Sequence, residues 1–445
     1  MTALSNDVLA QEIHKALVPL NAVPTDGDLP GEVSIGRVRS RGRVSPADNV
    51  AVMTLMDVDG VLVWEDGALS ASTVGARRWR RAGAPQADGT VVTQVKYQKP
   101  LGVSSIVDKL HTFDASLTPE AGNDRTPGSA LLEYDTSLNR ISGSAEPQNE
   151  GPILLLIHGT FSNTGNLAQE LRLNPAFVKR LKKSGYRQIL GYDHFTVSRT
   201  PIINAADLAR RFARTDAELH IICHSRGGLV TRWFCEMLDR QPNRHRRVVF
   251  VGCPLQGTSL ADPKSLRNGL NLMTNVGRAL GQGFALVPFL AAASGLMQIL
   301  SSVTSIGAKT PLVDAGIGLL PGIAAMSRIE KHAELNTLNH GAATDRDHYY
   351  AVCSNFETED PGWKFWKYFN KGKLADSAAD YLVFEQDNDL VVDTSSMTYH
   401  AFGAAPDFTN ANRFCRFDGA QRVHHTAYFR EPETLEFTAR SFGMA

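Results

Sequence analysis

The fold is decided by the stretch Ile221-Ile222-Cys223-His224-Ser225-Arg226-Gly227-Gly228-Leu229-Val230. An apolar run over residues 219–223 predicts a strand, and apolar residues recur at helical spacing after Gly228. Ser225 lies at the turn between them. A serine at such a turn has a strained backbone and an exposed hydroxyl, as in a nucleophile elbow, although Cys223 replaces the usual first glycine. The stretch therefore predicts a candidate serine nucleophile, with an ordinary strand-helix turn as the alternative.

Strands and helices alternate on both sides of this turn. A continuous apolar run predicts a buried strand at residues 153–157, and further strands are expected at 188–192 and 248–252. Helical patterns fall at residues 176–184 and 205–212. Such alternation with short connections predicts an α/β fold with a mostly parallel central sheet.

The first buried strand is followed by His158-Gly159-Thr160. A loop at this position can aim a backbone N–H at a developing oxyanion, and Gly159 permits close approach. We expect the N–H groups of Thr160 and Arg226 to be the two donors. A polar loop that only caps a helix is the alternative.

These motifs and their order resemble the α/β-hydrolase superfamily, and most closely its bacterial lipase and lecithin-cholesterol-acyltransferase-like branch. The resemblance covers residues 151–445 and implies a triad in the order Ser, Asp, His. Asn388-Asp389-Leu390-Val391-Val392 is similar to the turn that carries the acid, so Asp389 is the expected acid and Asp393 the alternate. Val423-His424-His425-Thr426-Ala427-Tyr428-Phe429 resembles the family's His-x-x-Tyr-Phe ending. His425 is therefore the expected base and His424 the alternate, while His224 should be structural and point away from the chemistry.

The chain before residue 151 has a different character. We expect a helix and linker at 1–30, a β-rich region at 31–120 and a linker at 121–150, ahead of a hydrolase domain at 151–445. Asp-Gly turns separate short strand-like runs in the β-rich region. Its arginines at positions 37, 39, 41 and 43 alternate and would share one strand face, and a second basic cluster covers residues 77–81. A solvated face is the favoured interpretation, with binding to nucleic acid or to an anionic membrane as the alternative.

An insertion at about residues 259–345 interrupts the hydrolase domain. Its apolar segment 279–326 carries no charged residue between positions 279 and 308. An apolar lid is the favoured interpretation. A fixed cap is the second, and a membrane-spanning helix, which needs about 20 apolar residues, is the third.

Composition narrows the class of protein. Lys and Arg total 46 and so do Asp and Glu, so the net charge of zero predicts no nucleic-acid partner. Five scattered cysteines are typical of reduced thiols, and no spacing indicates a metal site or a cofactor. The N-terminal residues lack the pattern of a secretory signal, which favours a cytoplasmic protein.

The expected function is that of a serine hydrolase that cleaves carboxylic esters with an apolar acyl chain. A phospholipase or an acyltransferase is the alternative among enzymes. The rival outside enzymes is a catalytically silent scaffold that docks on a membrane or a protein through residues 279–326. The expected partner is a lipid or small ester, with association at a membrane surface possible and the oligomeric state open.

Overall fold

The structure is a computed structural model of the 445-residue chain. It describes residues 4–27, 50–66, 89–98, 103–123, 128–241, 244–261, 266–280, 293–301, 320–328, 333–339, 347–358, 365, 387–398 and 412–444. The chain forms two compact units. Unit 1 comprises Met1–Phe113, Pro263–Leu319 and Glu359–Glu385, and unit 2 comprises Asp114–Asp262, Leu320–Thr358 and Gln386–Ala445.

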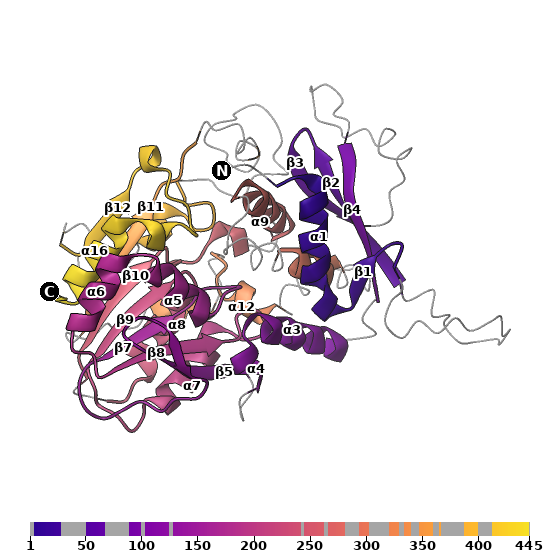
Figure 1. Ribbon diagram of the computed structural model, residues 1–445. Helices are drawn as coiled ribbons and strands as arrows, with labels where there is room; N and C mark the ends of the chain where they lie inside the picture. Colours follow the sequence, from indigo (N-terminus) through magenta and orange to yellow (C-terminus); the bar gives the residue numbers. More distant parts are fainter. Residues whose placement is uncertain are drawn as a thin grey trace. The chain divides into compact units, whose positions relative to one another are not determined.

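Unit 2 is built on an eight-stranded sheet in the order β12-β11-β10-β9-β7-β8-β5-β6. Its strands are β5 (Ser129–Tyr134), β6 (Arg140–Ser142), β7 (Ile153–Ile157), β8 (Gln188–His194), β9 (Leu219–His224), β10 (Arg246–Val251), β11 (Asp347–Ser354) and β12 (Phe414–Phe417). The strands from β12 to β8 pair in parallel, and β5 and β6 add antiparallel at one end (Figure 1). This mostly parallel sheet, with the serine turn after β9, confirms the predicted α/β-hydrolase fold.

Helices connect these strands in unit 2. The longer ones are α5 (Thr164–Arg172), α6 (Pro175–Lys183), α7 (Pro201–Arg211), α8 (Gly227–Arg232), α13 (Ala333–Asn339) and α16 (Pro432–Ser441). A π-helical segment, η3 (Trp233–Leu238), continues α8. Short helical turns are α4 (Pro119–Asn123), η4 (Ser259–Ala261), α12 (Pro321–Ala324), α15 (Thr394–Met397), η8 (Gly419–Gln421) and η9 (Tyr428–Arg430).

Both faces of the sheet are covered, because its central strands are apolar on both sides. Leu154 and Leu156 of β7 face a core to which α5, α6 and α16 contribute. Alternation along the strand turns Ile157 to the opposite face. There Gly227 of α8 approaches the Ile157 side chain. The turn that carries Ser225 therefore lies where a buried strand meets a tightly packed helix.

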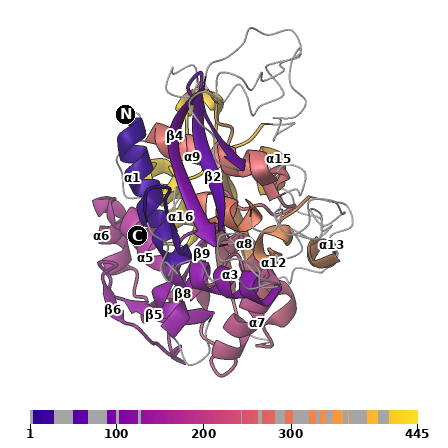
Figure 2. The ribbon, with the colours of Figure 1, turned by 90° about the vertical axis from the view of Figure 1, so that its right-hand side faces the viewer.

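Unit 1 holds a four-stranded antiparallel sheet in the order β1-β4-β2-β3. Its strands are β1 (Ala22–Pro24), β2 (Val50–Val58), β3 (Val61–Asp66) and β4 (Gly89–Gln98). Helix α1 (Asn6–Leu17), followed by the turn η1 (Val18–Leu20), lies along β4 (Figure 2). Asp59 and Gly60 both have positive φ in the β2–β3 turn, as their Asp-Gly sequence predicts. The predicted β-rich N-terminal region is thereby confirmed.

Helix α9 (Leu266–Leu280) covers the edge of this sheet with side chains instead of a strand. Asn275 accepts the N–H of Leu62 on β3 through Oδ1 (2.8 Å) and donates to the Leu62 carbonyl through Nδ2 (2.8 Å). Asn271, one turn earlier, accepts the N–H of Trp64 (3.0 Å). Polar groups of an edge strand that would invite pairing with another chain are thus satisfied within unit 1.

Two parts of the expected domain layout differ from the structure. The expected linker at 121–150 contains β5 and β6, because its apolar residues complete the sheet beside β8. Residues 263–319 of the expected insertion group with unit 1. Residues 103–117 form α3 (Val103–Leu117), and residues 293–301 are also helical.

Several expectations fall on residues outside the described ranges. They include the four alternating arginines, the cluster at 77–81 and most of the apolar segment 279–326. The lid and the fixed cap therefore stay predictions. Within the ranges that the structure describes, no helix is long and apolar enough to cross a membrane.

Candidate active site

Ser225 lies at the turn between β9 and α8, as the sequence predicts. Its φ is +52°, in the left-handed region that residues with a side chain seldom enter. The Ser225 N–H donates to the Val251 carbonyl (3.0 Å), and the Gly228 N–H donates to the Ser225 carbonyl (2.9 Å). Backbone strain held in place by neighbouring hydrogen bonds is typical of functional sites. Ser225 therefore has the backbone of a nucleophile elbow.

Small residues make this turn possible. A Cβ added to Gly159 would lie 2.6 Å from Ser225 Cβ, and one added to Gly227 would lie 2.7 Å from the His158 carbonyl oxygen. Neither position has room for a side chain, which explains why both are glycine. Cys223, in place of the usual first glycine, is buried, with Sγ 3.5 Å from the Val249 carbonyl oxygen.

Asp389 and His425 come together as expected. Nδ1 of His425 lies 2.8 Å from Oδ2 of Asp389, and the His425 N–H donates to the Asp389 carbonyl (2.9 Å). The ring of His425 packs against that of His224, the residue before Ser225, with 4.7 Å between ring centroids. The structure thus holds the expected acid and base together and sets the base against the elbow.

The surroundings of Asp389 keep it ionised. Oδ1 accepts the N–H groups of Val391 (3.1 Å) and Val392 (2.8 Å). Burial raises the pKa of Asp389, but His425 and the donors around the carboxylate outweigh burial and hold the pKa below its usual value. Leu390 replaces the glycine of the family turn and takes φ +84°, the left-handed conformation that glycine adopts easily.

The other two histidines near the elbow are neutral supports. Burial, followed by the charge of Arg430, lowers the pKa of His424 to about 4. Burial, followed by His425, lowers the pKa of His224 to about 3. The expectation that His224 points away is wrong: its Nε2 lies 3.0 Å from the His425 carbonyl oxygen, and its ring packs at a tilt against the ring of the base. A neutral His224 can donate this hydrogen bond and so anchor the segment that carries His425.

The two expected oxyanion donors flank Ser225. Thr160 follows Gly159, which abuts Ser225, and Arg226 follows Ser225 directly. In the part of the chain that the structure describes, neither backbone N–H donates to another protein group. Unused N–H groups at this position suit a site that stabilises a developing negative oxygen.

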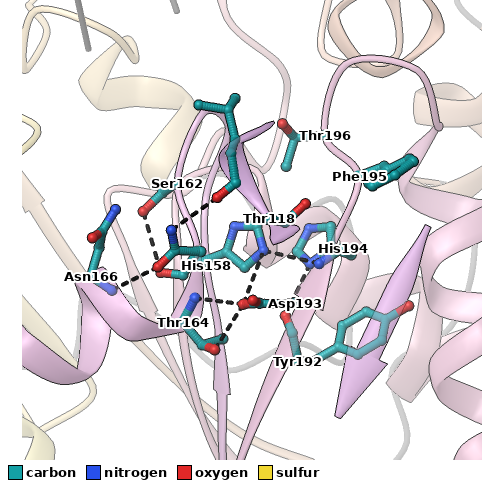
Figure 3. A network of polar contacts seen from close by, with 12 residues as sticks. Thr118, His158, Ser162, Thr164, Asn166, Tyr192, Asp193, His194, Phe195 and Thr196 are labelled. Carbon is teal, nitrogen blue, oxygen red and sulfur yellow. Dashed lines mark hydrogen bonds and ion pairs between the residues drawn. The ribbon is translucent and has the colours of Figure 1, made fainter. Parts of the chain in front are cut away.

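The loop that carries Thr160 rests on a buried polar network (Figure 3). Nε2 of His158 accepts the N–H of His194 (3.1 Å), and Nδ1 lies 2.8 Å from the Gly159 carbonyl oxygen. These contacts assign the proton of a neutral His158 to Nδ1. Asp193 accepts both the N–H (2.7 Å) and the hydroxyl (2.8 Å) of Thr164 at the start of α5. The network fixes both ends of the loop between β7 and α5.

Asp114 shapes the neighbouring loop. Its buried carboxylate accepts the N–H groups of Thr196 (2.9 Å), Val197 (3.1 Å) and Ser198 (2.7 Å). The Thr196 hydroxyl in turn accepts the N–H of Phe161 (3.3 Å), the residue after Thr160. The loop of the candidate oxyanion donors is therefore tied to Asp114 through two steps.

Residues 320–328 pack close to the same loop. The Met326 sulfur lies 3.7 Å from the Thr160 hydroxyl, and the Gly322 N–H donates to the Val197 carbonyl (2.9 Å). The fully buried Arg226 side chain donates from Nε to the Gly322 carbonyl (3.4 Å). Burial lowers the pKa of Arg226 to about 10, well above neutral pH, so the guanidinium stays charged.

The alternate acid Asp393 has other partners. Its Oδ2 pairs with Arg328 (3.0 Å) and accepts the hydroxyl of Ser259 (3.0 Å). Asp393 also occupies the N-cap position of α15, where its backbone carbonyl accepts the N–H of Met397 (3.2 Å). These contacts give it a structural part in the loop after Asp389, whereas the contact with His425 belongs to Asp389.

Sequence reasoning missed three supporting residues. Tyr428 was quoted in the His-x-x-Tyr-Phe pattern without a role, yet its hydroxyl donates to Asp389 Oδ2 (2.8 Å). A Cβ on Gly252 would lie 2.7 Å from the Tyr428 ring and 3.3 Å from His425 Nδ1. For Gly252, the signal available in the sequence was a glycine at the end of a predicted strand. Asp114 had no signal, because its partners lie 82 to 84 residues away.

Comparisons with known proteins match the chain to one family model and to distantly similar solved structures. The model of a family described as "Domain of unknown function (DUF7379)" matches residues 130–443. No curated protein sequence matches the chain. The solved mature lipase BlEst2 of Bacillus licheniformis is 13% identical with a TM-score of 0.37, covering 70% of this chain and 97% of its own. Lipase 1 of Pelosinus fermentans is 13% identical with a TM-score of 0.38, covering 66% and 98%. Because structures this distant add little, the fold assignment rests on the chain's own strand order.

Proposed function

Since the chain belongs to the family described as "Domain of unknown function (DUF7379)", we propose a function from its own side chains: a serine hydrolase that cleaves carboxylic esters with an apolar acyl chain. One observation carries the proposal. His425 is paired with buried Asp389 at 2.8 Å, and its ring packs at a tilt against His224, the residue that precedes a serine with left-handed backbone. A base oriented by a carboxylate beside a strained serine is the arrangement of nucleophilic acyl transfer.

The proposed reaction has two halves. Ser225 Oγ attacks the ester carbonyl carbon while His425 Nε2 takes the hydroxyl proton, and the oxyanion accepts hydrogen bonds from the N–H groups of Thr160 and Arg226. His425 then protonates the departing alkoxide, which leaves as the alcohol. Water attacks the acyl-enzyme with His425 again as base, releasing the acid and restoring Ser225. Asp389 holds the Nδ1 proton of His425 throughout and stabilises the imidazolium.

The apolar acyl chain is supported by the surroundings of Thr160. Met326 is buried with its sulfur near the Thr160 hydroxyl, and Leu320 and Ile323 of the same segment are also buried. Sites for apolar ligands combine such walls with a few polar groups.

Two related activities share this machinery. A phospholipase would cleave the same bond in a lipid with a charged headgroup, and an acyltransferase of the lecithin-cholesterol type would replace water by an alcohol. A silent scaffold is disfavoured, because Ser225, His425 and Asp389 would have no common purpose in it. A cytoplasmic location and association with a membrane surface belong to the same proposal.

Covalent labelling tests the nucleophile. A fluorophosphonate probe should label the wild-type chain, and Ser225→Ala should abolish labelling. p-Nitrophenyl esters from acetate to palmitate then report the acyl preference, which we expect to rise with chain length. Unlabelled wild-type protein that also leaves every ester intact would refute the proposal.

A matched pair of variants tests the base. His425→Ala should lower kcat by on the order of 10³-fold or more, since triad members act as a unit. His424→Ala removes the adjacent ring and should retain most of the activity. The reverse ranking would transfer the role of base to His424, and no effect in either variant would remove the triad.

A further inference from the structure

Tyr428 shares one carboxylate oxygen with the candidate base. Its hydroxyl donates to Asp389 Oδ2 (2.8 Å), the same oxygen that His425 Nδ1 contacts at 2.8 Å. Tyr428 is fully buried in η9, three residues after His425. Burial, followed by the charge of Asp389, raises the pKa of Tyr428 well above its usual value. The phenol therefore stays protonated and acts as a donor.

The phenol proton has one strong acceptor. The Ser354 hydroxyl, which donates its own proton to the Val423 carbonyl (2.6 Å), and the Met397 sulfur also lie within reach of the phenol, at 3.1 and 3.4 Å, but both are neutral acceptors. A carboxylate is a stronger acceptor than a neutral hydroxyl. With two backbone donors on Oδ1, Asp389 thus receives hydrogen bonds on both oxygens.

We propose that Tyr428 is a positioning residue that acts through Asp389: by donating to Oδ2 it withdraws negative charge from the atom that faces His425 and so weakens the hold of His425 on a proton. This inference rests on the proposed function. It assigns Tyr428 a part in setting the pH at which the base becomes available, beyond its packing.

The direction follows from electrostatics. A donor that stabilises the carboxylate competes with the imidazolium for the same charge. Without the Tyr428 hydroxyl, Oδ2 carries more charge, the imidazolium is favoured, and His425 should keep its proton to a higher pH. The effect should be modest, because His425 and the two backbone N–H groups remain.

Other titratable groups near His425 do not change the direction of the shift expected for His425. His224 packs against the base, and His424 precedes it; their lowered pKa values keep both rings neutral near pH 6 to 7. Burial raises the pKa of Cys353, which faces Tyr428 from β11, to about 12, so its thiol is also neutral. Within the described residues, Asp389 is the charged group in direct contact with His425.

The test is the pH profile of Tyr428→Phe, which removes the hydroxyl and keeps the ring. The acidic limb of kcat/KM should move to higher pH by about half to one unit, while KM at the plateau changes little. Tyr192→Phe is the matched control: its buried hydroxyl donates to the Asn204 carbonyl (2.7 Å), away from Asp389. Its profile should match the wild type. An acidic limb that stays in place in Tyr428→Phe would overturn the inference.

A second variant tests the same inference if Tyr428→Phe folds poorly. 3,5-Difluorotyrosine incorporated at position 428 keeps the shape and is a stronger donor, so the limb should move to lower pH. A shift in the same direction as Tyr428→Phe, or none, would contradict the proposed withdrawal of charge.

An assay that needs no ester turnover tests the part of Tyr428 separately from the proposed hydrolase function. Nitrogen NMR of ¹⁵N-histidine-labelled protein, assigned with His425→Gln, gives the pKa of His425 directly. A raised His425 pKa in Tyr428→Phe supports the inference even if no ester is cleaved, whereas an unchanged value refutes it. Ester turnover with an unchanged His425 pKa would leave the hydrolase function standing and remove only the part of Tyr428.

Discussion

Lowering the pH from 7 to 5 should cost this fold about 4 kcal/mol through two histidines beside the elbow. Burial, followed by neighbouring positive charge, lowers the pKa of His424 to about 4 and that of His224 to about 3, from an ordinary value of 6.5. The folded chain therefore binds these protons less readily than the unfolded chain. Their contribution to stability is present above pH 6.5 and is lost as the pH falls below it.

The size of this loss in stability follows from the pH interval over which each histidine is protonated in the unfolded chain but not in the folded chain. Between the ordinary value of 6.5 and pH 5 each histidine loses about 1.4 kcal/mol per pH unit, or about 2 kcal/mol. Burial also lowers the pKa values of His158 and His194, so these rings act in the same direction.

Urea unfolding at pH 7 and pH 5, followed by tryptophan fluorescence, measures this difference. His424→Gln removes one titrating ring and should reduce the loss between the two pH values by about 2 kcal/mol. His245→Gln is the control, because this exposed ring meets water in the folded and the unfolded chain alike. Equal stability of the wild type at both pH values, or an unchanged loss in His424→Gln, would refute the reasoning.

Three further substitutions test other parts of the structure. Gly252→Ala places a Cβ 2.7 Å from the Tyr428 ring at φ +57°, so we expect ester turnover to fall by at least about tenfold, checked by kcat on a short soluble ester. Asn275→Ala leaves the N–H and C=O of Leu62 without their partner and should cost about 2–4 kcal/mol in urea unfolding, with little effect on turnover. Asp393→Asn removes the carboxylate that pairs with Arg328, so it should lower the melting temperature and leave the pH profile of ester turnover in place. Loss of activity without loss of stability would instead identify Asp393 as the triad acid.

Much of the fold was readable from the sequence. The buried strands at 153–157 and 188–192 and the elbow strand were found, because a run rich in apolar residues between turn residues is a local signal. Helix α5 and strands β5 and β6 were missed. Their stabilisation comes from partners such as β8, which the local pattern does not reveal.

The candidate site, like the fold, was predictable in part from local sequence and in part only from the structure. Ser225, Asp389 and His425 could be proposed from short motifs, since each motif carries the turn or ending that its residue needs. The His-x-x-Tyr-Phe ending favours His425 over His424 but does not show the contact with the acid, and no motif says which way His224 points. Those outcomes depend on side-chain geometry between segments far apart in the chain, and the structure pairs His425 with Asp389.

The sequence by itself determined that a serine at a strand-helix turn follows a buried parallel strand and that an acid and a histidine come later in the required order. Local apolar periodicity and turn chemistry are enough for that, because they act over a few neighbouring residues. Only the tertiary structure decided that Tyr428 shares an oxygen of Asp389, that Gly252 leaves room for the pair, and that asparagines of α9 close the edge of a sheet in unit 1. Each of these contacts joins residues that are distant in the sequence or meet only through a turn. The packing of each whole unit brings these residues into contact, and local conformational preference alone would not.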